Sequence, residues 1–263
     1  MGLDSLVWVC IILAEAVVVL LLIWKHVFRP LPAFFLFACW SLLSDTLLFA
    51  VFSLHPAIYF RTYEIGLIID SVMIFSVLVE LAWSVLSPIR SSIPRHSWIV
   101  IALLIVVAGL VVWPVAGLTL PAHLTPAGMN FFRLQQTTAI LRVLVFLGMA
   151  GFSQLLSIGW RNRELQIATG LGLYSIVSLA VSVLHTYQIS GRPQYEWLDE
   201  VVVASYLAAL VYWAVCFATK EAERQEFTPQ MQNLLLAVAG AARSTRSGLL
   251  DSLSTTPRNQ KEP

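Results

Sequence analysis

The sequence predicts an all-α membrane protein, a seven-transmembrane-helix bundle followed by a short amphipathic tail helix. Two observations lead to this fold class. Of the 263 residues, 58% are hydrophobic and only 12% are charged, which is a composition typical of multi-span membrane proteins. In addition, seven apolar runs are each long enough to cross ~30 Å of hydrocarbon as a helix. They cover about 5–24, 33–54, 63–87, 97–118, 134–158, 165–188 and 198–219.

Residues 1–219 are predicted to form one transmembrane domain, because the links are short and neighbours in sequence should be neighbours in the bundle. The first run follows no basic segment and no small-residue cleavage site, so it is expected to be an uncleaved anchor. Residues 220–263 are predicted to be a cytoplasmic tail with a short helix near 228–250 and a disordered end. That helix fits either a position on the membrane surface or an ordinary tail helix without a role.

The distribution of basic residues favours an outside N-terminus and a cytoplasmic C-terminus. The links after the first, third and fifth runs carry two basic residues each, and the alternate links carry one each. The pairs are Lys25 and Arg29, Arg90 and Arg95, and Arg161 and Arg163, while the single residues are Arg61, Arg133 and Arg192. Lys220 and Arg224 add to the cytoplasmic side.

Arg142 is the deepest basic residue in any of the runs. It lies about two turns inside the run 134–158, so its side chain starts roughly 12 Å below the surface at 1.5 Å per residue. A charge at that depth costs about 3 kcal/mol on insertion scales, and it therefore needs a partner.

Three further polar residues begin at the level of Arg142. Asp45, Asp70 and Tyr206 are all roughly 10–14 Å below the outer face when each helix is counted inward. Because the charges are complementary and little water is present, Arg142 is predicted to contact Asp45, Asp70 or both. The cluster therefore indicates an outward-facing polar pocket. A purely structural ion pair is the alternative.

Helical spacing adds more candidates. Thr138 shares the stripe of Arg142, and the sixth run presents Ser175, Ser178, Ser182 and His185 on one face. Serines in membrane helices usually serve packing or bond to the i−4 carbonyl, and a lone His near a rim is usually an interface residue. Glu15 near mid-depth and Glu80 toward the inner face suggest a possible proton relay. The candidate binding residues are therefore Asp45, Asp70, Arg142, Thr138, Tyr206, Ser178, Ser182 and His185, with Glu15 and Glu80 as candidate relay residues.

No catalytic residues, metal or cofactor are predicted. A retinal pump needs a lysine inside the last run, and Lys220 lies at its end. His185 alone among the five histidines lies in a run, so the three ligands of a catalytic zinc site are not expected. The three cysteines lack metal or redox spacing and read as small hydrophobic residues. A net charge of +1 gives no reason to expect nucleic acid.

One resemblance rests on Trp160-Arg161-Asn162-Arg163, on the segment Gly170-Leu171-Gly172-Leu173-Tyr174-Ser175, on Tyr63-Glu64 and on Glu80. This pattern resembles uncharacterised seven-span proteins of bacterial genomes over roughly the third to seventh runs. The resemblance implies a protein of the bacterial inner membrane with no known activity. None of these motifs is specific to a chemistry.

The residues themselves favour a non-enzymatic sensor or receptor embedded in the lipid bilayer. A small-molecule ligand would occupy the polar pocket, and the basic inner loops and tail would contact a cytoplasmic protein partner. The alternative is a small-solute or proton-coupled transporter, in which Glu15, Asp70 and Glu80 form steps of a relay.

Overall fold

The computed structural model describes residues 3–85, 97–117, 126–152, 162–186 and 196–219. Within these ranges lie seven α-helices and one 3-10 helix: α1 (Leu3–Trp24), α2 (Pro32–Leu54), η1 (Pro56–Ile58), α3 (Tyr59–Val85), α4 (Ser97–Ala116), α5 (Pro126–Phe152), α6 (Arg163–Thr186) and α7 (Glu196–Ala218). All seven α-helices are long and apolar enough to cross a membrane, so the predicted fold class is confirmed. The tail helix expected near 228–250 lies outside the described residues.

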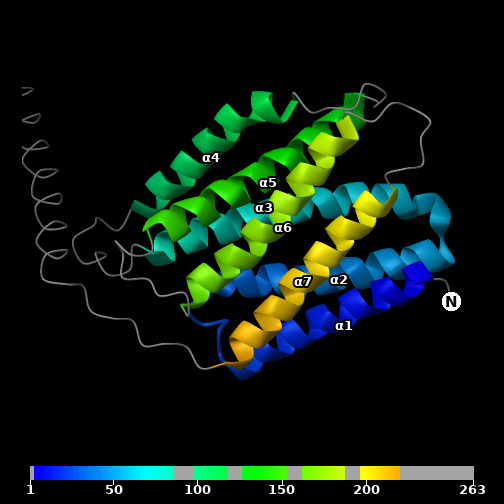
Figure 1. Ribbon diagram of the computed structural model, residues 1–263, viewed down its shortest axis with the longest axis horizontal. Helices are drawn as coiled ribbons and strands as arrows, with labels where there is room; N and C mark the ends of the chain where they lie inside the picture. The colour runs from blue at the N-terminus through cyan, green and yellow to red at the C-terminus, as the bar shows by residue number, and fades with distance from the viewer. Residues whose placement is uncertain (1–2, 86–96, 118–125, 153–161, 187–195, 220–263) are drawn as a thin grey trace, which may run out of the picture.

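The helices form a closed ring. In order around the ring, α1, α2, α3, α5, α6 and α7 each pack on the next, and α7 packs back on α1 (Figure 1). Helix α4 lies outside this ring and packs mainly on α5 and α3. We call the end of the bundle near Leu3 the N-side and the end near Trp24 the far side.

The outer position of α4 follows from its sequence. After Ser97 it carries no charged or hydroxyl side chain, and many of its large apolar side chains are exposed, among them Val100, Leu104, Leu110 and Val111. Helix α4 therefore presents a largely apolar outer surface. Pro114 near its end leaves the helix continuous to Ala116.

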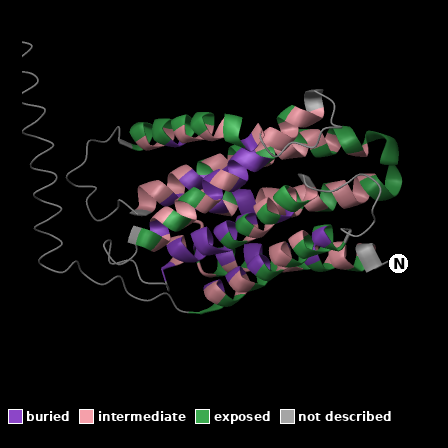
Figure 2. Cartoon of the chain, turned by 45° about the horizontal axis from the view of Figure 1, so that its top comes forward, coloured by how far each residue is buried: buried purple, intermediate pink, exposed green. Residues whose placement is uncertain are grey.

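The apolar core lies mainly toward the far side. Leu22, Leu81 and Phe217 are almost completely buried there, and Phe34 packs edge-to-face on Trp213 with ring centroids 5.3 Å apart. Figure 2 shows the same asymmetry, because the N-side ends of the helices are mostly intermediate or exposed. The two halves of the bundle thus differ, one densely packed and the other looser and more polar.

Two glycines let α6 approach its neighbours closely. Gly170 faces the indole of Trp213 on α7, and Gly172 faces the ring of Phe146 on α5. An added Cβ would overlap the facing ring at either position. Small residues at helix contacts are the usual way in which membrane helices pack closely.

Two predicted helix starts were too late. Helix α3 begins at Tyr59 rather than near residue 63, and α5 begins at Pro126 rather than near residue 134. The apolar runs begin only after Arg61 and Arg133, but the helical backbone begins before them. A helix can include such residues because long basic side chains extend along it toward its end. Both arginines therefore lie in helices and not in links. The predicted end of the fifth run, at residue 158, lies outside the described residues.

Candidate functional site

A polar cavity of about 420 Å³ lies inside the helix ring and is referred to below as the Arg142 cavity. Its polar lining comes from five helices: Ser41, Ser44 and Asp45 of α2; Tyr63, Asp70 and Ser71 of α3; Gln135, Thr138 and Arg142 of α5; Tyr174 of α6; and Tyr206 of α7. The spacing of three, four or seven residues within a helix places these side chains on one face. The cavity brings together the five predicted residues Asp45, Asp70, Thr138, Arg142 and Tyr206.

Arg142 lies farther from the start of its helix than the run 134–158 predicted. Because α5 starts at Pro126, Arg142 is about 24 Å along the helix from its start. Its side chain is only 7% exposed, and its guanidinium carbon lies 5.4 Å from the centroid of the Tyr174 ring. This is the distance of a cation–π contact. Among the described residues, the buried Nε has no hydrogen-bond partner.

The two aspartates face Arg142 without direct contact. Arg142 and Asp70 are close enough to interact electrostatically. Among the described residues, however, no nitrogen–oxygen contact of 4.0 Å or less joins Arg142 to Asp45 or Asp70. The predicted direct ion pair is therefore wrong. A similar depth places two residues at the same height in the bundle, but their side-chain rotamers decide whether they touch. Arg142 contacts Tyr174 instead.

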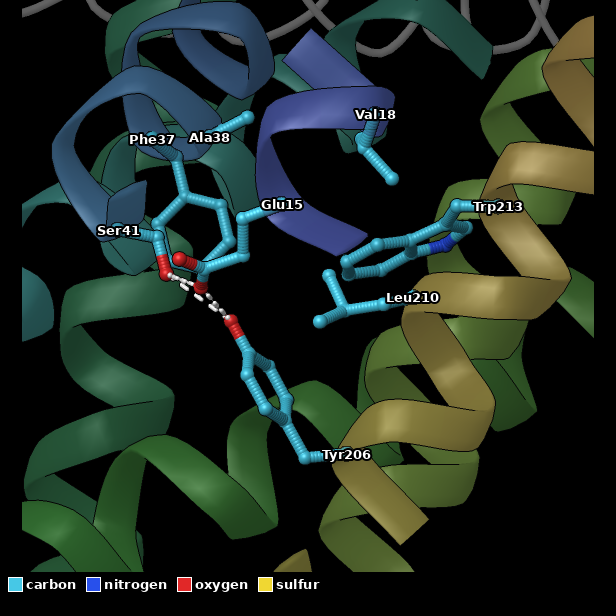
Figure 3. Close-up of a pocket in the computed structure, with 8 residues that line it drawn as sticks. All are labelled: Glu15, Val18, Phe37, Ala38, Ser41, Tyr206, Leu210 and Trp213. Atoms are coloured by element: carbon cyan, nitrogen blue, oxygen red, sulfur yellow. Dashed lines mark hydrogen bonds between the residues drawn. The ribbon is translucent and has the colours of Figure 1, made fainter. Parts of the chain in front are cut away.

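Glu15 of α1 forms a second polar group next to this cavity. It is 1% exposed, and its Oε1 accepts hydrogen bonds from Ser41 Oγ at 2.7 Å and from the Tyr206 hydroxyl at 2.5 Å. Figure 3 shows this arrangement, in which α1, α2 and α7 meet at one carboxylate beside a small cavity of about 10 Å³. Glu15 Oε2 is buried and accepts no hydrogen bond from a described donor, although Asp45 lies close enough to interact.

A larger cavity of about 580 Å³ lies nearer the N-side and is called the His185 cavity. The predicted residues Ser178, Ser182 and His185 line it, together with Gln136 and Asp199. His185 Nε2 lies 3.1 Å from Asp199 Oδ1, and the Gln136 amide donates to Ser182 Oγ. Gln135 and Val203 line both this cavity and the Arg142 cavity, so the two adjoin.

Comparison of the chain with protein-family models, with curated proteins and with solved structures found no match. The chemistry of the cavities must therefore be judged from their geometry. The resemblance to bacterial seven-span proteins stays a prediction.

Glu80, a candidate relay residue, has a clear structural role. Its two carboxylate oxygens accept hydrogen bonds from the backbone N–H groups of Ala33 and Phe34, at 2.8 and 2.9 Å. These N–H groups belong to the first turn of α2 and have no partner within that helix. Glu80 therefore caps α2 on the far side, and it does not line the Arg142 cavity, the His185 cavity or the small cavity beside Glu15.

The sixth-helix serines divide into two roles. Ser175 is fully buried and donates to the Leu171 carbonyl at 2.7 Å, which is the expected packing role. Ser178 and Ser182 face the His185 cavity.

Sequence reasoning missed Tyr174, which lies next to Ser175. The buried Arg142 could have indicated this residue, because the partner of a buried guanidinium can be an aromatic ring face as well as a carboxylate.

Within the part of the chain that the structure describes, no three His, Cys, Asp or Glu side chains converge to hold a metal ion. The Arg142 cavity instead offers hydrogen-bond donors, carboxylates and aromatic faces. Sites of this kind bind and orient a small polar molecule.

Proposed function

We propose that this protein is a non-enzymatic receptor or sensor that binds a small polar solute in the Arg142 cavity. One observation carries the proposal. Arg142 is buried, has an unpaired Nε, and lines a cavity of about 420 Å³ together with Asp45 and Asp70. Ionisable groups inside a membrane are costly and usually functional. The volume falls within the range of roughly 300–1,000 Å³ that is typical of small-molecule sites.

The packing of the bundle supports one-sided access. The His185 cavity adjoins the Arg142 cavity from the N-side, where His185 and Asp199 lie at the ends of α6 and α7. On the far side, Leu22, Leu81 and Phe217 are buried in the dense core. A solute that enters from the N-side meets this core beyond the cavity, which favours binding without transport.

The basic-residue bias supports an outside N-side and a cytoplasmic far side. In this orientation the ligand comes from outside, and basic residues such as Lys25 and Arg29 face a cytoplasmic protein partner. The resemblance to bacterial seven-span proteins supports a location in the bacterial inner membrane.

The test is a binding and uptake experiment on the full chain. Purified protein is screened by thermal shift with chemically diverse small solutes, including amines, carboxylates, zwitterions and neutral polyols. At least one class should raise the melting temperature of the protein, and that solute should not accumulate in proteoliposomes. If no class stabilises the protein, the receptor proposal fails.

Transport is the second candidate, because Glu15 continues the polar lining inward from the Arg142 cavity through Ser41 and Tyr206. Labelling of cysteines introduced at Ser41 and Ser84, in a background without Cys10, Cys39 and Cys216, separates the two functions. Ser41 lines the cavity, and Ser84 lies at the far-side end of α3. Labelling of Ser41 from both faces of the membrane would favour the transporter, whereas labelling from the N-side alone would favour the receptor.

A further inference from the structure

We propose that the Arg142 cavity selects a zwitterion, a small solute that carries both an ammonium group and a carboxylate. This inference rests on the proposed receptor function and names the ligand class of the same site. It is carried by Arg142, whose buried Nε has no hydrogen-bond partner among the described residues, and by the carboxylates of Asp45 and Asp70, which line the same cavity.

Arg142 is the anchor for the carboxylate of the ligand. Its guanidinium carbon lies 5.4 Å from the centroid of the Tyr174 ring, and the N–H donors of a guanidinium point outward in its plane. A cation–π contact uses none of these donors in a hydrogen bond. A carboxylate matches these donors with two parallel hydrogen bonds, and such charge-assisted bonds are among the strongest in proteins.

Asp45 and Asp70 are the anchors for the ammonium group. They come from neighbouring helices and line the same cavity. In the described ranges neither carboxylate has a Lys, Arg or His nitrogen within 4.0 Å. The aromatic rings of Tyr63, Tyr174 and Tyr206 also line the cavity, and ring faces attract alkylammonium groups.

Ligands with a single charge fit this site less well. An amine satisfies the aspartates but leaves the guanidinium of Arg142 without an anionic partner from the ligand, which is costly in a low-dielectric interior. A carboxylate satisfies Arg142 but faces two acids of the same sign. A zwitterion offers a carboxylate to Arg142 and an ammonium group to the two aspartates. It also brings no net charge into the membrane interior, where an added charge is unfavourable.

The experiment compares matched solutes on the full-length protein in nanodiscs. Each set contains a zwitterion and its two single-charge analogues, for example 4-aminobutyrate, butylamine and butyrate, and further sets cover α-amino acids and betaines. Affinity is measured by isothermal titration calorimetry and by thermal shift. The best zwitterion should bind at least about tenfold more tightly than both of its analogues, the factor that corresponds to about 1.4 kcal/mol.

The comparison needs no variant, so it decides the question even if changes at Arg142 prevent folding. Where Arg142→Gln folds, it should lose the preference for the zwitterion over the amine, while Arg61→Gln on the exposed surface of α3 should keep it. Equal binding of an amine or a carboxylate, or binding of neutral solutes alone, would overturn the inference and leave the receptor proposal standing. Absence of binding by every solute class would overturn both.

Discussion

Tyr206 of α7 donates a 2.5 Å hydrogen bond to the Glu15 carboxylate of α1, and this bond joins the first and last described helices of the ring. Ser41 of α2 donates to the same carboxylate oxygen at 2.7 Å. The carboxylate is thus a junction between three helices, and it lies beside the Arg142 cavity because Ser41 and Tyr206 also line that cavity. Closure of the bundle and the shape of the site are therefore linked through Glu15.

We predict that Tyr206→Phe destabilises the protein by about 1–3 kcal/mol, because a buried carboxylate loses a charge-assisted donor. The midpoint of unfolding in a denaturing detergent measures this loss. Tyr63→Phe is the matched control, since Tyr63 lines the same cavity without a described hydrogen bond from its hydroxyl. Equal stability of the two variants would show that the hydroxyl of Tyr206 contributes nothing to closure of the ring.

Gly170→Ala should destabilise the bundle by about 1–3 kcal/mol, because the new methyl group overlaps the Trp213 indole and overpacks the contact between α6 and α7. Gly148→Ala in α5 is the control, since no described residue lies within 4 Å of a Cβ at that position. It should be neutral or slightly stabilising. Thermal unfolding of both variants in the same detergent gives the comparison, and a neutral Gly170→Ala would mean that the close helix contact is absent.

Glu80 caps the start of α2, so changes at Glu80 should lower the stability of the protein. Glu80→Gln retains one acceptor oxygen but loses the charge that favours the helix N-terminus, and Glu80→Ala loses both hydrogen bonds to α2. We expect a loss of about 0.5–2 kcal/mol for the alanine variant and a smaller loss for the glutamine variant. Glu64→Gln on the same helix serves as the control. Ligand affinity should not change in any of these variants, and a large change would restore Glu80 as a functional residue.

The sequence alone predicted the seven helices because each has enough apolar length to cross a membrane. It placed the starts of α3 and α5 too late, since hydropathy falls at Arg61 and Arg133 while the helix continues outward. Hydropathy shows where apolar side chains lie, whereas a helix extends as far as its backbone hydrogen bonds continue. Helix ends are for this reason the least predictable part of such a fold.

For the site, depth and helical spacing were enough to place Asp45, Asp70, Thr138, Arg142 and Tyr206 around one cavity. The partners of each side chain were beyond prediction. The sequence gives no rotamer for Arg142, and the packing of α5 on α6 decides that it meets Tyr174. Likewise, the bond from Glu80 to the start of α2 joins residues 46 and 47 positions apart, and nothing local to either segment indicates it.

The orientation of the bundle is predicted from its basic residues and is open to a direct test. The links expected on the far side carry two basic residues each, whereas the N-side has one basic residue in or near each connection: Arg61 in α3, Arg133 in α5 and Arg192 between α6 and α7. The C-terminus should therefore be cytoplasmic. A reporter fused to the C-terminus should be active only if it functions in the cytoplasm. Activity of a periplasm-dependent reporter at the same position would reverse the orientation and would place the mouth of the His185 cavity on the inside.

The last prediction concerns the charge balance of the Arg142 cavity. Arg142→Met removes the cation that faces Asp45 and Asp70 and leaves two acids of like sign in a membrane interior. Because no direct ion pair is broken, the loss of stability should stay below the roughly 3–5 kcal/mol that removal of one partner of a buried pair costs. Arg61→Met, at an exposed arginine of α3, should change the stability by less than about 0.5 kcal/mol.

Adding Asp70→Asn to Arg142→Met should recover part of this loss, because one of the uncompensated acids is then neutral. The double-mutant cycle should show a coupling free energy of about 0.5–3 kcal/mol between the two positions, although no direct ion pair joins them. Adding Asp45→Asn as well should raise the stability further. Unfolding midpoints in one detergent provide the measurement for five proteins: the wild type, Arg142→Met, Asp70→Asn, the double variant and the triple variant. Strictly additive losses would mean that Arg142 acts through its packing on Tyr174 alone, and the cavity would then have no shared charge balance.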